Sequence, residues 1–124
     1  MDMRGYQRYR EESLQTMTQG ELLLLLYDEL VKRLTQAELA LSKENYPLME
    51  TAVDKSVEIL HYLDSTLDHH YAISQNLTRL YEFFCYELSR VKTGRNATEL
   101  TRVKTMVSEL RESFRQADKN QTDR

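Results

Sequence analysis

The chain has 124 residues, a length that fits one domain with a hydrophobic core of its own. Its formal net charge of −3 argues against a nucleic-acid-binding protein, whose affinity would come from a clustered excess of lysine and arginine. With 40% hydrophobic and 30% charged residues, the composition is neither that of a disordered chain nor that of a membrane protein.

Glycine and proline are scarce. Three glycines and one proline leave little material for the tight turns of a sheet, so we expect a few long helices. The single cysteine excludes an internal disulfide, and the polar N-terminal sequence contains no signal peptide. The longest apolar run, at residues 22–27, is far shorter than the roughly 18 residues of a membrane-spanning helix. These features predict an all-α cytosolic protein.

The first predicted helix begins at residue 18 and ends between residues 42 and 45. Thr18 and Glu21 form a capping box, in which each side chain can accept a hydrogen bond from the backbone N–H of the other residue. Apolar residues at helical spacing then predict one buried face. The residues of this face are Leu23, Leu26, Tyr27, Leu30, Leu34, Ala37 and Leu41.

The second predicted helix starts at Asn45, a residue type that caps helices well. Pro47 fits the first turn, because the N–H that proline lacks would have no partner there. The helix is predicted to end between residues 69 and 71. Its apolar residues are Leu48, Ala52, Ile59, Leu60, Leu63 and Leu67.

The third and fourth predicted helices meet at Gly94, which is expected to end the third helix in a left-handed conformation. The fourth helix opens at Asn96, with Glu99 three residues later as a second capping box. Its apolar residues follow a heptad-like spacing up to residue 114. The apolar residues of the third helix are Ile73, Leu77, Leu80, Tyr81, Phe84, Leu88 and Val91.

Four amphipathic helices joined by short loops bury their apolar faces best as an antiparallel up-down four-helix bundle. The predicted organisation has three parts. Residues 1–17 form an N-terminal arm, residues 18–117 form the bundle, and residues 118–124 form a flexible C-terminal tail.

The first helix carries more apolar residues than one face can bury. Leu22 lies a quarter turn to one side of the buried face, Leu24 and Val31 lie as far to the other side, and Leu25 points away. Exposing one leucine forgoes ~1.5–3 kcal/mol, and several together form a patch typical of a binding site. Three explanations for what covers these side chains remain. The N-terminal arm could be a permanent part of the core, or an amphipathic segment of another chain could bind there with the arm as a removable cover. A second copy of the same chain could also pack on them.

Aromatic residues on the third helix favour a groove for another chain. Phe83 lies on a flank of this helix with Asn76 and Glu87, and Tyr81 and Tyr86 lie away from the centre of the buried face. Aromatic side chains offer large contact areas at low entropic cost, which suits peptide recognition. The alternative is that these tyrosines lie at the edges of the bundle with their hydroxyls in water.

The residues contain no convincing catalytic or metal-binding pattern. Glu58 and His61 match half of a di-metal motif, but the second half is absent and both residues lie off the apolar stripe. Cys85 has no cationic neighbour in sequence, so we interpret it as a small core residue. We expect no enzyme, no cofactor and no metal. Other possible metal ligands cluster near the end of the second helix, where we interpret them as a solvent-exposed flank rather than a specific site. These residues are His61, Asp64, Asp68, His69 and His70.

Three segments carry a resemblance to a known family. TMTQGELLLLLYD at residues 16–28 is similar to the family pattern TASPxELxxMLYD, STLD at 65–68 to SLD, and QNLTRLYEF at 75–83 to xNLxxLYDY. In this order and spacing, they resemble the family of the flagellar secretion chaperone FliS. The sequence departs from that pattern at Gln19, where the family has proline, at residues 68–73, where many members have a glycine turn, and at Phe114, where they have tryptophan.

The resemblance implies a cytosolic chaperone of flagellin. Such a chaperone binds the disordered C-terminal segment of new flagellin as helices in apolar grooves. It prevents premature polymerisation and keeps the subunit competent for type III flagellar export. The resemblance also implies that the N-terminal arm, through Tyr6, Tyr9 and Leu14, covers a groove when no client is bound and contacts a component of the export gate.

We therefore predict a non-enzymatic export chaperone that binds flagellin one-to-one as a monomer and neither binds nucleic acid nor inserts into a membrane. Asn76 would supply a polar contact to the client backbone. The alternative is a homo-oligomeric structural bundle without a secreted client. The predicted client-binding residues are Leu22, Leu24, Leu25, Tyr27, Val31, Asn76, Leu80, Tyr81 and Phe83.

Overall fold

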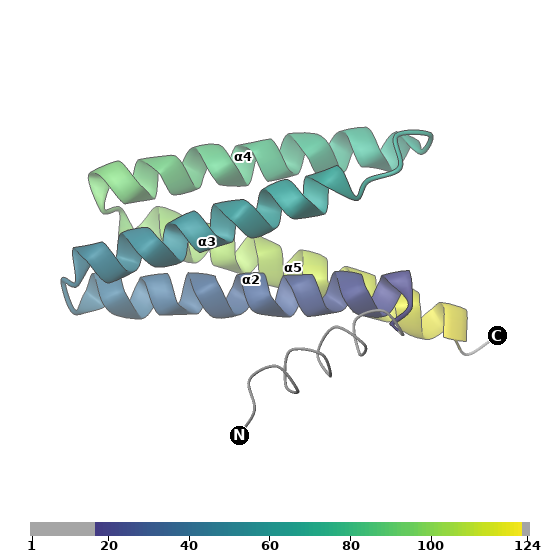
Figure 1. Cartoon of the computed structure of the whole chain (residues 1–124), viewed down its shortest axis with the longest axis horizontal. Coiled ribbons are helices and arrows are strands. Elements are labelled where there is room, and N and C mark those ends of the chain that lie inside the picture. The colour runs from purple at the N-terminus through teal and green to yellow at the C-terminus, as the bar shows by residue number, and fades with distance from the viewer. Residues whose placement is uncertain (1–16, 123–124) are drawn as a thin grey trace, which may run out of the picture.

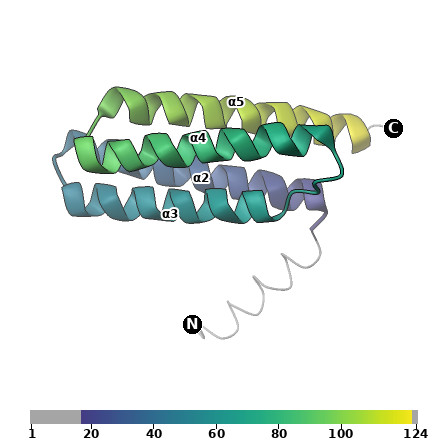
Figure 2. The ribbon, with the colours of Figure 1, turned by 90° about the horizontal axis from the view of Figure 1, so that it is seen from above.

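The computed structural model describes the backbone of residues 17–122 and the side chains of residues 17–120. In this part of the chain it contains four helices, α2 (Gln19–Ser42), α3 (Tyr46–Ser65), α4 (Ala72–Gly94) and α5 (Ala97–Thr122). The helices run alternately up and down (Figure 1). Each packs against its neighbours in sequence, and α5 closes the ring against α2 (Figure 2). The prediction of an antiparallel four-helix bundle is confirmed.

Helix α2 begins and ends close to its predicted bounds. The Oγ1 of Thr18 accepts a hydrogen bond from the backbone N–H of Glu21 at 3.1 Å, which is one half of the predicted capping box. At the other end, the backbone N–H of Lys43 donates to the carbonyl of Leu39. Glu44 then takes a left-handed conformation with φ 57, which turns the chain towards α3.

Helix α3 has the predicted start but ends earlier than predicted. Asn45 Oδ1 accepts from the backbone N–H of Leu48 at 3.3 Å, and Pro47 lies in the first turn. The helix ends at Ser65 rather than at residues 69–71. Local hydrogen bonds explain the difference, because Asp68 Oδ1 accepts from the backbone N–H of His70 at 3.0 Å and fixes a turn where the periodicity predicted helix.

The junction of α4 and α5 differs from the prediction in one respect. Gly94 stays helical, and the left-handed residue is Arg95, with φ 56 and ψ 40. A side-chain contact accompanies this backbone, since the Arg95 guanidinium stacks over the Tyr46 ring at 3.5 Å from its centroid. Asn96 then caps α5 as predicted, accepting from the backbone N–H of Glu99 at 3.1 Å. Helix α5 continues to Thr122, into the segment predicted as the C-terminal tail.

The core follows the predicted stripes with two corrections. Leu48 and Ile73, predicted to be buried, lie in the first turns of α3 and α4 and are 52% and 59% exposed. Met49, one residue after Leu48, is buried instead. The largest fully buried side chains of the core come from all four helices: Tyr27, Leu30, Leu34, Met49, Leu60, Leu63, Phe84, Leu88 and Leu100.

Two tyrosines meet in the centre of the bundle. The hydroxyls of Tyr27 on α2 and Tyr81 on α4 are hydrogen-bonded at 2.5 Å, and both side chains are buried. The ring of Phe114 on α5 stacks on Tyr27 at 5.5 Å between centroids. Burial raises the pKa of both hydroxyls, so both stay protonated and can satisfy each other. This contact joins three helices.

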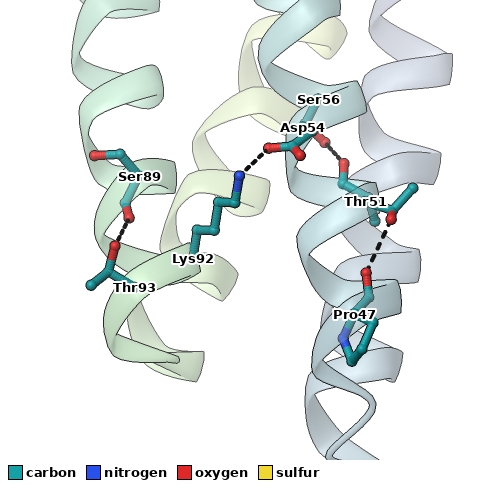
Figure 3. Close-up of polar contacts among 8 residues, drawn as sticks. Pro47, Thr51, Asp54, Ser56, Ser89, Lys92 and Thr93 are labelled. Carbon is teal, nitrogen blue, oxygen red and sulfur yellow. Dashed lines mark hydrogen bonds and ion pairs between the residues drawn. The ribbon is translucent and has the colours of Figure 1, made fainter.

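Polar contacts on the surface hold neighbouring helices in register. Lys92 Nζ on α4 donates to Asp54 Oδ1 on α3 at 2.9 Å (Figure 3). On the opposite side of the bundle, Glu38 on α2 accepts from Lys104 Nζ at 2.8 Å and from Thr101 Oγ1 at 2.7 Å, both on α5. Partial burial acts to raise the pKa of Glu38, but these two hydrogen bonds outweigh it and lower the pKa.

Candidate functional site

An apolar groove lies between the first half of α2 and the second half of α3. It has a volume of about 370 Å³. Leu25 and Tyr62 are the exposed side chains that line it, at 39% and 51%. We call this surface the α2–α3 groove. Its apolar lining residues are Leu22, Leu25, Leu26, Ile59 and Tyr62.

A second hollow continues from the groove towards the connection between α3 and α4. This end pocket has a volume of about 350 Å³ and shares Leu22 and Leu26 with the groove. Tyr71 and Ile73 line it and are 65% and 59% exposed. The turn that ends α3 early therefore also places these two apolar side chains beside the start of α2. Together the two hollows form one continuous apolar surface.

Two acidic residues also line the α2–α3 groove, and each is paired along its own helix. Arg33 Nη2 lies 3.0 Å from Glu29 Oε1 on α2. Lys55 Nζ lies 3.8 Å from Glu58 Oε2 on α3. The charge at the groove is therefore largely balanced within the protein.

The predicted client-binding residues of α2 lie on two different flanks of this helix. Leu22 and Leu25 line the α2–α3 groove. Leu24 and Val31 are half-buried and lie on the other flank, in line with Glu38 at a spacing of seven residues. Because Glu38 contacts α5, this second flank faces α5 rather than α3.

Tyr27 and Tyr81, also predicted for the client-binding surface, are core residues in this structure. They are 0% and 2% exposed, and each hydroxyl is bonded to the other. Neither side chain lines the α2–α3 groove or the end pocket. The structure therefore places both tyrosines beneath the surface rather than on it.

The predicted residues of α4 lie towards α5. Asn76 is exposed, and Leu80 and Phe83 are half-buried against the core. Arg102 of α5 lies over the Phe83 ring at 6.0 Å from its centroid, and Phe84 is its neighbour at 6.1 Å. We call Asn76, Leu80 and Phe83 the α4–α5 surface. It is separated from the α2–α3 groove by the body of the bundle, so the nine predicted residues do not form one site.

The sequence prediction missed the α3 and loop residues of the apolar surface. The sequence predicted neither a core position nor a binding role for Tyr62 and Tyr71. It predicted Ile59 and Leu26 only as core residues. One signal was available, because Ile59 and Tyr62 are three residues apart and therefore neighbours on a helix surface. Tyr6, Tyr9 and Leu14, predicted as the cover, lie outside the described residues.

Of the candidate catalytic and metal-binding residues, Glu58 lines the α2–α3 groove and Asp68 lines the end pocket. Cys85 is half-buried, and burial raises the pKa of its thiol. His70 Nδ1 lies 2.7 Å from Asp68 Oδ1 in the exposed turn after α3. Across the described residues, no three histidine, cysteine or acidic side chains are grouped to hold a metal ion. None of the helices in that part is long and apolar enough to cross a membrane.

The fold and the groove define a small all-α bundle with an open apolar surface. Its sequence places it in a known family, since a family model of the flagellar protein FliS matches residues 2–121. The chain belongs to the FliS family of flagellar chaperones, which confirms the resemblance seen in the sequence.

Two known proteins illustrate this relationship. The flagellar secretion chaperone FliS of Bacillus subtilis (strain 168) is 25% identical over 112 residues, which are 90% of this chain and 84% of the relative. A crystal structure described as a flagellar chaperone from bacteria superposes with a TM-score of 0.78 at 18% identity. The match covers 97% of this chain and 99% of that one, and it supports the fold.

Proposed function

We propose that this chaperone binds the disordered C-terminal segment of flagellin and that the segment folds into an amphipathic helix in the α2–α3 groove. The open groove carries the proposal, because Leu25 and Tyr62 stand exposed along an apolar hollow of about 370 Å³. A helix lying in such a groove would present apolar anchors at every third and fourth residue. The relative described as a flagellar secretion chaperone supports a flagellar client.

The apolar character of the groove suits a client that is disordered beforehand. Ordering a disordered segment costs free energy, so the bound segment has to bury a large apolar surface. The end pocket extends that surface past Tyr71 and Ile73. A client buried along both hollows would hide the apolar side chains that otherwise drive flagellin to polymerise, and it would stay competent for type III export in the cytosol.

The α4–α5 surface is proposed as a second contact for a client that wraps around the bundle. Phe83 offers an aromatic face, and the exposed amide of Asn76 can bond a client backbone. Leu24 and Val31 on the α5 side of α2 are proposed to extend the contact of the wrapped client. Tyr6, Tyr9 and Leu14 remain proposed as the N-terminal cover that gives way to client and contacts the export gate.

Calorimetric titration with the C-terminal segment of the flagellin from the same cell tests the groove. Leu25→Asp removes an apolar contact and introduces an unpaired charge, so we expect the affinity to fall about ten- to a hundredfold or more. Leu39→Asp is the matched control, because Leu39 also lies on α2 and is 57% exposed but does not line the groove. Equal loss in both variants, or no loss in either, contradicts the site.

Light scattering tests the stoichiometry against the homo-oligomeric alternative. The protein alone should have the mass of one chain, 14.7 kDa, and the complex should contain one chaperone and one flagellin. A stable oligomer that Leu25→Asp converts to monomer, with no binding of the flagellin segment, would favour packing between like chains instead.

A further inference from the structure

Two acidic side chains face each other between α4 and α5. Glu87 of α4 is 6% exposed, and Glu99 lies half-buried in the first turn of α5. The Oε2 atom of each carboxyl group is buried and accepts no hydrogen bond from a protein donor. The two carboxyl groups are instead within hydrogen-bonding reach of each other. Ionised carboxylates only accept hydrogen bonds, so this contact needs a proton on one of them.

The charged neighbours of the pair do not replace that proton. Arg90 Nη1 lies 3.7 Å from Glu87 Oε1, and Arg102 Nη1 lies 3.7 Å from Glu99 Oε2, both too far for a hydrogen bond. Both arginine side chains are more than half exposed. On the other flank of α4, which faces α3, Lys92 is engaged with Asp54.

The electrostatic balance at the pair favours the protonated form. The hydrogen bond with Glu99, burial and the Glu99 charge all raise the pKa of Glu87, while Arg90 and Arg102 act in the opposite direction with smaller effect. A raised pKa in the folded protein means that the pair stabilises the fold most at low pH. That contribution is lost as the pH rises through the pKa of the folded state.

We propose that Glu87 and Glu99 share one proton, and that this proton fastens α4 to α5 so that the contact loosens when the proton leaves. With the proton, one carboxyl donates to the other and the pair carries a single negative charge beside two arginines. Without it, two carboxylates of like charge, each with one buried oxygen, face each other and repel.

Loosening this contact would act on the α4–α5 surface. Phe83 lies one helical turn before Glu87, and Arg102, which flanks the pair, also lies over the Phe83 ring. Separation of α4 from α5 at this point would therefore uncover Phe83. If the α4–α5 surface binds client as proposed above, the proton sets how much of that surface is open; this last step alone rests on the proposed function.

Carbon-13 NMR of the side-chain carboxyl groups of the full chain tests the shared proton directly. Glu87 should titrate in a step at higher pH than an ordinary glutamate, and Glu99→Gln should move that step to lower pH because the contact with the Glu99 carboxyl group is lost. The isosteric variant Glu87→Gln should remove that step, because the amide donates to Glu99 without titrating. If Glu87 titrates in the ordinary range of a glutamate, or if its step moves on addition of Na⁺, K⁺ or Mg²⁺ as for a bound cation, the proposal is overturned.

Amide hydrogen exchange tests the loosening. After correction for base catalysis, exchange in α4 around residues 83–91 should speed up in the parent protein as the pH rises through the step, and it should stay flat in Glu87→Gln. Glu58→Gln is the matched control and should behave like the parent. Should Glu87→Gln fold poorly, Glu99→Gln gives the same comparison from α5. Exchange that follows the parent in both variants contradicts the fastening role.

Discussion

Glu44 and Arg95 hold the two tight connections of the bundle in left-handed conformations, with φ 57 and 56. A left-handed backbone costs an ordinary L residue about 1–2 kcal/mol relative to the right-handed region, and glycine avoids that cost. The two positions differ in their side chains. Arg95 stacks on Tyr46, whereas Glu44 is exposed.

Glu44→Gly is therefore expected to raise the free energy of unfolding by about 0.5–1 kcal/mol, after allowing for the greater entropy of unfolded glycine. Glu44→Ala is the control, because alanine has a Cβ and keeps the strain. The free energy of unfolding should rise less for Arg95→Gly, because this variant also loses the contact with Tyr46. Urea denaturation of the three variants measures the effect, and equal gains for Glu44→Gly and Glu44→Ala would contradict the conformational explanation.

The tyrosine pair in the core gives a second prediction for single residues. Tyr81→Phe leaves the Tyr27 hydroxyl buried without its partner, so we expect a loss of about 1–3 kcal/mol in stability. Replacing both tyrosines with phenylalanine removes both polar groups and should cost less than the sum of the single changes. A double-mutant cycle measured in urea checks this, and strict additivity would show that the hydroxyls do not stabilise each other.

Among the elements, α2 and α5 are joined by a polar contact that depends on pH. Glu38 has a lowered pKa in the folded protein, so its contribution exists above the pKa of the unfolded chain and is lost as the pH falls through the folded value. Glu38→Gln should cost about 0.5–1 kcal/mol at pH 7, and this cost should shrink as the pH falls through the folded pKa of Glu38. Stability curves measured across the acid range test this. Glu58→Gln, whose partner lies on its own helix, should change stability little at any of these pH values.

The helices themselves were predictable because their apolar spacing and caps are local. Thr18, Asn45 and Asn96 mark three helix starts in sequence, and all three side chains make the expected hydrogen bonds. The helix ends were less predictable. At the end of α3, the Asp68 side chain bonds the backbone in a turn that competes with helix. At the end of α4, Arg95 contacts Tyr46, which belongs to another helix.

The candidate site was harder to predict for the same reason. A helical wheel places Leu22 and Leu24 on opposite flanks, but it does not say which neighbouring helix covers each flank. Only the packed bundle shows that Leu22 lines a groove with Ile59 of α3, while Leu24 lies on the flank that faces α5. The side of a helix that binds a partner is set by which neighbours leave it open, and that is a property of the whole fold.

At the scale of the whole molecule, the balanced charge of the groove predicts how binding responds to solution conditions. Glu29 and Glu58 are already paired with Arg33 and Lys55, so few ions should be displaced when the flagellin segment binds. We expect a weak dependence of affinity on salt and a negative heat-capacity change from apolar burial. Calorimetry at several salt concentrations and temperatures measures both. A steep fall of affinity with salt would point to charged recognition elsewhere.

Because the four helices form a closed ring, the chain could begin at a different helix without changing which helices are neighbours. The start of α2 and the end of α5 touch, since a Cβ at Gly20 would lie 2.0 Å from Asp118 Oδ1. A chain reopened at the connection of residues 43–45, with its old ends joined by a flexible linker, would leave every helix between the same two neighbours (Figure 2). Such a circular permutant should refold to the same bundle with its new termini at the far end from Tyr71 and Ile73, leaving the end pocket free of them.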